Sequence, residues 1–256
     1  MGKARKIIFT VLTVIILIPV VLSIVLQFPG VQTGLLRFVS NKISQNIEGD
    51  ISLGRAYYSM PNRVILNDIC LTQSEGRDTV FYLHKLLVHV NVPALANGDL
   101  RAKRIAIEDG EFNIWNVNDS TTNLDLLLGE EENRSPKKEL DLPDITVDRL
   151  SIKKFGFSML NPFVTVDSSS VSSPNQIDWD NLIVRDINLD ARKIEIQKEI
   201  TLNLVNLAMR ESHGLDVNTF RGKIKISNKP GIKGIYIDGL RYDDGLSTLS
   251  SKTFSL

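Results

Sequence analysis

Residues 194–204 read IleGluIleGlnLysGluIleThrLeuAsnLeu, and this stretch sets the expectation for the fold. Its even positions are apolar apart from Lys198, whereas its odd positions are Glu, Gln, Thr and Asn. Alternation of this kind places the apolar side chains on one face of a β-strand and the polar ones on the other. The stretch is therefore predicted to be one half-buried strand, or two strands with a tight break near Lys198.

The same period of two recurs on both sides of this stretch, from Asp50 onward. Downstream, Phe220, Gly222, Ile224 and Ile226 alternate with polar residues, and so do Ile235 and Ile237. Upstream, 105–107 and 112–114 flank Asp109-Gly110, a dipeptide typical of a β-hairpin turn. Alternating strands with one polar face favour antiparallel pairing over βαβ units.

A short motif recurs within this β region. A polar pair precedes an apolar-x-apolar triplet at 67–71, 103–107, 148–152 and 185–189. The first apolar residues are Ile69, Ile105, Leu150 and Ile187, so the copies start 36, 45 and 37 residues apart. The repeat indicates stacked β units that extend one long sheet. Two stretches, near 130–142 and 168–176, are charged or serine-rich and are predicted to be solvated loops.

The chain begins with a basic tail, 1–6, and continues with twenty residues, 7–26, that carry no charge. At ~1.5 Å per residue a helix of this length spans the roughly 30 Å of a hydrocarbon core. A cleaved signal peptide is the alternative, but its apolar run is about 7–15 residues long and ends in a small-x-small site, which is missing here. The sequence therefore predicts a transmembrane anchor with a cytoplasmic N-terminus, because the basic residues precede the apolar run.

Residues 29–47 are predicted to form an amphipathic helix, because apolar residues recur there at spacings of three and four. The helix either packs against the core or caps a hydrophobic groove beside the bilayer. One such helix is too little to cover the apolar face of a sheet of ten or more strands. The sheet must curl on itself, pack against a second sheet, or cover its apolar face with another material such as lipid.

The sequence offers little that would support catalysis. Thirty basic and thirty acidic residues cancel, which gives no reason to expect nucleic acid as a partner. Cys70 is the only cysteine, so an intramolecular disulfide is excluded. His84 and His89 are five residues apart, and on one regular strand they point to opposite faces, too far apart to share a metal. The acidic groups at 141–148 and 243–244 are interpreted as turn and strand-end carboxylates.

Nucleotide-binding, zinc-protease and serine-hydrolase motifs do not occur in the sequence. We therefore expect no enzyme activity, no catalytic residue, no metal and no cofactor.

The order of these segments resembles that of the AsmA-like proteins, and most closely the TamB family, the inner-membrane subunits of the translocation and assembly module. The resemblance is carried by GlyAspIleSerLeuGlyArgAla at 49–56, LeuAsnAspIleCysLeu at 66–71, the apolar strand at 80–90, ProAlaLeuAlaAsnGlyAspLeu at 93–100 and ArgIleAlaIleGluAspGlyGluPheAsnIle at 104–114. The stretches at 123–128 and 213–226 and an expected strand pair at 145–160 agree with it. It covers essentially the whole chain and rests on order and spacing, without an invariant catalytic motif.

The resemblance implies a bacterial inner-membrane protein whose residues 50–256 form a curled antiparallel β-groove of stacked repeats in the periplasm. Such proteins are thought to pass phospholipid toward the outer membrane and to support outer-membrane protein assembly with an Omp85-type partner. They are often much longer, so this chain is expected to be the N-terminal portion of a longer protein or a truncated product. Docking to the outer-membrane partner is then not expected of this chain.

Three functional hypotheses follow. In the first, the protein is a lipid conduit, and apolar residues of one face line a groove for phospholipid acyl chains; the candidates are Ile105, Ile107, Phe112, Ile114, Ile200, Leu202 and Leu204. In the second, the sheet packs shut and the protein is an envelope assembly scaffold that pairs its strands with partners. The third is an envelope enzyme or sensor domain.

Overall fold

The computed structural model describes residues 49–59, 62–73, 78–91, 94, 100–128, 144–164, 177–197, 199–229 and 232–255. The expected basic tail at 1–6, anchor at 7–26, amphipathic helix at 29–47 and both predicted loops lie outside these residues. Within the described ranges, no helix is both long enough and apolar enough to cross a bilayer.

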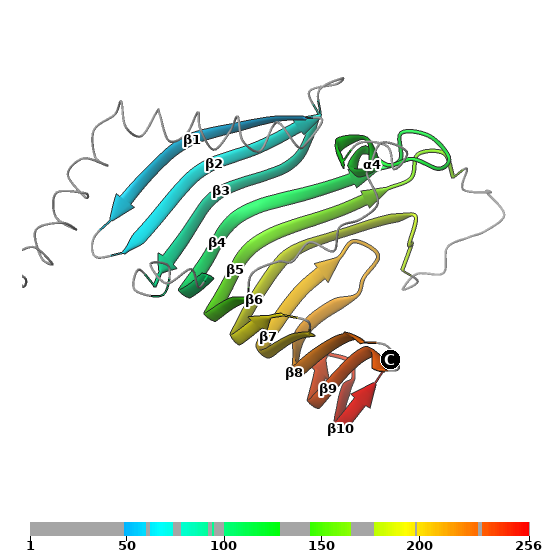
Figure 1. The fold of residues 1–256 in the computed structure, drawn as a ribbon. Coiled ribbons are helices and arrows are strands. Elements are labelled where there is room, and N and C mark those ends of the chain that lie inside the picture. Colours follow the sequence, from blue (N-terminus) through cyan, green and yellow to red (C-terminus); the bar gives the residue numbers. More distant parts are fainter. Residues whose placement is uncertain are drawn as a thin grey trace, which may run out of the picture.

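The described residues form one open sheet of ten strands with a single short helix (Figure 1). The strands are β1 Gly49–Ser59, β2 Arg63–Gln73, β3 Thr79–Val90, β4 Leu100–Trp115, β5 Ile145–Leu160, β6 Asn181–Ile196, β7 Glu199–Glu211, β8 Asp216–Lys229, β9 Ile232–Asp243 and β10 Thr248–Ser255. The helix, α4, is Asn123–Leu128. The strands lie in chain order, so each one pairs with its neighbours in the sequence. The mainly β fold is confirmed.

Pairing is antiparallel everywhere except between β4 and β5, which are parallel, so the expectation of a wholly antiparallel sheet is wrong at this point. The cause is the length of the connection, 116–144, which contains α4. Parallel neighbours need a crossover of a dozen or more residues, and this segment is long enough to return the chain to the end where β4 began.

The strands contain pairs of successive residues that both point to the polar face. In β2, Leu66 pairs with Leu86 of β3 and Ile69 pairs with Leu83, while Asn67 and Asp68 lie between them. Asp68 has a φ of 55°, and this left-handed conformation bends the strand and shifts its alternation by one residue. Apolar side chains therefore stay on one face both before and after the bend.

The same pattern repeats from strand to strand, with the second residue of the pair at positive φ. Examples are Glu108-Asp109 in β4, Lys153-Lys154 in β5, Arg185-Asp186 and Arg192-Lys193 in β6, and Asp238-Gly239 in β9. The strands visibly bend along their length, so the sheet has the shape of an open trough (Figure 1). Non-glycine residues in this conformation cost about 1–3 kcal/mol each, which the surrounding strand pairing offsets.

The predicted hairpin at Asp109-Gly110 is wrong, because β4 continues through it from Leu100 to Trp115. Glu108 pairs with Lys85 and Gly110 pairs with Leu83, so the ladder to β3 runs on both sides of Asp109. A two-residue type I′ turn needs positive φ at both central residues, whereas here only Asp109 has it, at 58°. One left-handed residue bends the strand without reversing it.

Two other strand predictions have opposite outcomes. The break near Lys198 is confirmed, since β6 ends at Ile196 and β7 begins at Glu199. The expected strand pair at 145–160 is wrong: β5 is a single strand of 16 residues, bent at Lys154.

Candidate functional site: an apolar trough

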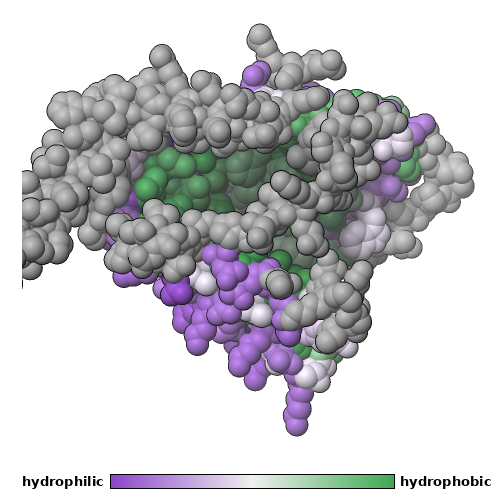
Figure 2. Space-filling model, viewed as in Figure 1, coloured by the Kyte–Doolittle hydropathy of each residue, from purple (hydrophilic) through white to green (hydrophobic). Residues whose placement is uncertain are grey.

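One face of the sheet, the trough face, collects apolar side chains from all ten strands. An aromatic group marks its first half: Phe81 of β3 contacts Phe112 of β4 and Phe155 of β5, with ring centroids 6.4 Å apart in both pairs. Phe112 also contacts Phe157, at 6.2 Å. Figure 2 shows a hollowed hydrophobic surface on this side of the molecule, with polar surface along its lower border.

The second half of the trough face is aliphatic. Val147, Ala191, Ile194 and Leu204 form a buried cluster that brings together β5, β6 and β7. Half-buried residues of β4 to β8 pack against it: Ala102, Ile105, Ile145, Leu150, Leu189, Ile196, Leu202, Leu207, Phe220 and Ile224. The trough face is therefore continuous from the aromatic group to β8.

Burial varies across the trough in a regular way. Several of the most buried apolar residues flank outward-pointing pairs, as Val184 does before Arg185-Asp186 and as Ile237 and Leu240 do around Asp238-Gly239. At these places the sheet is bent toward the trough, so side chains converge and exclude water. Farther along each strand the apolar residues are half-buried, and Ile226 and Ile235 are exposed. We call the buried residues of the trough, such as Val184, Ile237 and Leu240, its floor, and the half-buried residues farther along the strands its walls.

The seven candidate lining residues all lie on the trough face. Ile105, Ile107, Phe112 and Ile114 come from β4 on both sides of its bend, and they are half-buried. Ile200 and Leu202 of β7 are half-buried as well. Leu204 is only 4% exposed and belongs to the buried cluster, so it forms the floor of the trough and is not a free lining residue.

Helix α4 lies against the ends of β1 and β4. The backbone N–H of Trp115 donates to Oδ1 of Asn123 at 2.9 Å, and Nδ2 of Asn123 donates to the carbonyl of Asn113 at 3.0 Å. A Cβ on Gly49 of β1 would lie 2.6 Å from Cδ1 of Leu127, so this leucine already fills the space above Gly49. The fully buried Asn123 fastens the helix to β4 while Leu127 packs against β1.

The opposite, outer face is mostly polar and carries the charged contacts, although Ile65, Leu87 and Ala106 also lie on it. Lys85 Nζ lies 2.7 Å from Glu108 Oε2, and this contact lowers the pKa of Glu108. Asp68 Oδ1 lies 3.0 Å from His84 Nδ1 and accepts a hydrogen bond from the Tyr82 hydroxyl at 3.0 Å. These bonds, the one from His84 foremost, lower the pKa of Asp68, and the same carboxylate raises the pKa of Tyr82.

His84 and His89 both lie on the outer face, so the prediction that they point to opposite faces is wrong. The reason is the bend in β3, where His84 and Lys85 both point outward and shift the alternation by one. The two rings serve different partners, since His84 contacts Asp68 while His89 accepts a hydrogen bond from Arg63. No group of three potential metal ligands occurs among the described residues.

The acidic residues at 243–244 form a turn, as expected. Asp244 accepts hydrogen bonds from the backbone N–H groups of Ser247 and Leu246 and from two hydroxyls, and this arrangement lowers its pKa to about 2. Asp243 Oδ1 accepts from the N–H of Gly245 at 2.7 Å. Both carboxylates are therefore occupied by the β9–β10 connection.

In the sequence, the polar pairs of the repeat are the signal for these outward pairs and bends. A reading that assumes a strict period of two along each strand does not recognise them. Asn67-Asp68 and Arg185-Asp186 are bends with positive φ, and Lys103-Arg104 and Asp148-Arg149 are likewise outward pairs between inward apolar residues. Apolar–polar–polar–apolar is the pattern of a strand that bends toward its apolar face.

Comparison of the sequence with models of known families and with curated proteins gave no match.

Proposed function

We propose that this protein is a membrane-anchored conduit that holds phospholipid acyl chains in its apolar trough. The observation that carries the proposal is a continuous apolar face whose floor is packed but whose walls are only half-buried. Each methylene removed from water contributes ~0.8 kcal/mol, so an acyl chain binds such walls without any polar contact. In this function the protein needs no catalytic residue.

The dimensions of the trough fit this ligand. Ten strands at about 4.8 Å spacing give it a length of roughly 43 Å. One leaflet contributes about half of the ~30 Å hydrocarbon core, so more than one acyl chain fits end to end. The resemblance to the TamB family and the apolar run at 7–26 support a place in the bacterial inner membrane, with the trough in the periplasm and lipid passing toward the outer membrane in support of protein assembly there.

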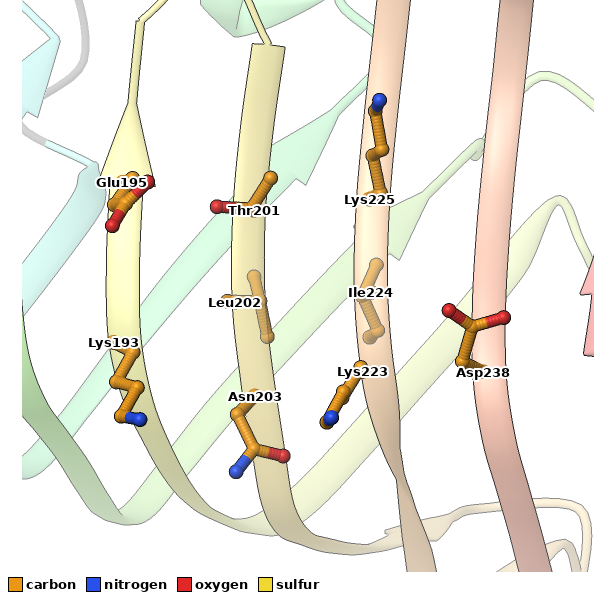
Figure 3. Close-up of a pocket in the computed structure, with 9 residues that line it drawn as sticks. All are labelled: Lys193, Glu195, Thr201, Leu202, Asn203, Lys223, Ile224, Lys225 and Asp238. Carbon is orange, nitrogen blue, oxygen red and sulfur yellow. The ribbon is translucent and has the colours of Figure 1, made fainter.

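The test is photo-crosslinking in living cells with a photoreactive residue at Ile107 or at Ile224. The matched control is Lys223, which neighbours Ile224 on β8 but points to the outer face (Figure 3). The conduit predicts phospholipid adducts at both apolar positions and none at Lys223. If the apolar positions crosslink only to protein, or only within the chain, the trough is closed and the conduit is refuted.

One observation favours a second function, that of an assembly scaffold. Within the described residues, β10 pairs only with β9, so its other side offers an edge for strand addition. A scaffold of this kind would capture partner protein at β10 in the same crosslinking experiment while the trough positions stay free of lipid.

A further inference from the structure

A row of basic residues crosses the outer face of the sheet, one strand after another. Arg63 of β2 pairs with His89 of β3, and His89 pairs with Arg104 of β4. Arg104 lies beside Arg149 of β5, because Ala102 pairs with Val147 and Ile105 with Leu150.

The row continues through the second half of the sheet. Arg149 pairs with Arg192 of β6, Arg192 pairs with Asn203 of β7, and Asn203 pairs with Lys223 of β8. These positions define the basic row: Arg63, His89, Arg104, Arg149, Arg192, Asn203 and Lys223. At about 4.8 Å per strand it is roughly 29 Å long.

The row is largely unneutralised. Arg149 forms an ion pair with Asp190, at 2.6 Å, but within the described residues none joins Arg63, Arg104, Arg192 or Lys223 to a carboxylate. The acidic residues that border the row are Asp148, Asp190, Glu195 and Asp238, and Asp238 of β9 pairs directly with Lys223. They are accompanied by Lys103, Lys193 and Arg221, so cations predominate.

The cations of the row also act on His89, in addition to its burial. Burial lowers its pKa first, and the charges of Arg63, Lys103 and Arg104 lower it further. Its Nε2 accepts a hydrogen bond from Nε of Arg63 at 2.9 Å, which requires an unprotonated nitrogen. A neighbourhood that disfavours one more positive charge is one that favours a bound anion.

Like charges directly opposite each other on neighbouring strands destabilise a sheet. The same outer face avoids this elsewhere, where Lys85 faces Glu108 and Lys225 contacts Glu199. Because opposite charges are readily accommodated on this sheet, the succession of cations in the basic row works against folding. A ligand that supplies the missing negative charges accounts for it.

The row borders two hollows on β6–β9. One, of about 450 Å³, is lined by the cations Arg192, Arg221 and Lys223, by Asn203 and by one carboxylate, that of Asp238. The other, of about 370 Å³, shares Asn203, Lys223 and Asp238 with it and adds Lys193, Lys225 and Glu195, so cations outnumber carboxylates in both. Figure 3 shows Lys193, Asn203 and Lys223 on the near side of the strands, with Leu202 and Ile224 behind them. Two cations with an amide between them can thus surround one anionic group.

We propose that the basic row binds a linear acidic polysaccharide. A one-dimensional row suits a polymer that carries its charges along a line, whereas a bilayer surface would engage cations spread in two dimensions. Nucleic-acid strands use aromatic stacking platforms, and protein partners use large apolar or aromatic anchors. None of the row residues is a Trp, Tyr, Phe or large aliphatic residue, and the row supplies cationic groups, one imidazole and one amide, which are the contacts a charged sugar chain makes.

The test measures binding of fluorescent polygalacturonate to the purified full chain in detergent. The row variant carries Arg104→Glu, Arg192→Glu and Lys223→Glu. The control variant carries the same change of charge outside the row, as Arg55→Glu, Lys153→Glu and Lys252→Glu. We expect the row variant to bind at least tenfold more weakly and the control variant to bind within about twofold of the parent chain. Equal losses in both variants would overturn the proposal.

Two additions to this experiment separate a folding defect from a loss of binding and compare the polysaccharide with other anionic ligands. If the row variant does not fold, as judged by circular dichroism, the milder pair Arg192→Gln and Lys223→Gln takes its place and must lose binding by several-fold. Polyglutamate, single-stranded DNA and phosphatidylglycerol vesicles are tested alongside polygalacturonate. If any of these binds more tightly than the polysaccharide and depends on the row, the assigned ligand class is wrong.

Discussion

Replacing Gly110 by alanine tests whether the trough face is the tightly packed side of the sheet. A Cβ at this position would lie 2.8 Å from the carbonyl oxygen of Tyr82, 2.9 Å from Cδ1 of Leu83 and 3.0 Å from Cε2 of Phe155. The carbonyl belongs to the β3–β4 ladder and cannot move without weakening it. Overpacking of this kind costs about 1–3 kcal/mol.

The matched control is Gly156→Ala, on the neighbouring strand. The nearest atoms to its Cβ would be Cβ of Glu111 at 3.7 Å, the Gly110 oxygen at 3.8 Å and the Val184 oxygen at 3.9 Å, all ordinary contacts. This variant is expected to be neutral or to stabilise by up to about 1 kcal/mol, because alanine restricts the unfolded chain.

Both variants are compared with the parent chain by urea unfolding in mild detergent, followed by tryptophan fluorescence, and by thermal unfolding. For a chain of this size about 1 kcal/mol corresponds to 2–4 °C, so Gly110→Ala should lower Tm by about 2–12 °C while the control does not. Equal stability of the two variants, with unchanged denaturant slopes, would refute the assignment of the tightly packed face.

Further predictions concern the floor, the bends and the titrating groups. Leu204→Ala should reduce the free energy of unfolding by about 2–5 kcal/mol because it opens a cavity in the floor, whereas Leu249→Ala, at a residue 55% exposed, should change it by less than about 0.5 kcal/mol in the same urea assay. Asp109→Val should destabilise by about 1–3 kcal/mol while Asp109→Gly is tolerated, since a β-branched residue resists a φ of 58°; equal effects would contradict the bend. The lowered pKa of His89 predicts an NMR titration midpoint below 6.5, with its contribution to stability complete above pH 6.5 and declining as the pH falls below it; a midpoint above 6.5 would remove the cationic field. Asp244 should titrate near 2 by carboxyl NMR, so the stabilisation it gives the β9–β10 turn is present above about pH 4 and is lost as the pH falls through 2; a midpoint near 3.8 would show that the turn hydrogen bonds are not made.

The alternation of apolar and polar residues could be read directly from the sequence, because side-chain direction in a strand depends only on local backbone geometry. It placed Ile105, Ile107, Phe112 and Ile114 on one face, although β4 bends between the two pairs. The two pairs share a face only because the bend at Asp109 shifts the alternation by one residue. A regular strand from Ile107 to Phe112 would have put them on opposite faces, and the hairpin interpretation hid this conflict.

The sequence by itself determined that the chain forms strands with one apolar and one polar face, because alternation and turn chemistry act over a few residues. Only the tertiary structure decided which residues bend the strands, that β4 and β5 run parallel, and that Leu204 is floor while Leu202 is wall. It also decided that basic residues from β2 to β8 form a single row. These features depend on register between strands distant in the sequence, and register is set by pairing and by packing at the bends, neither of which a local pattern contains.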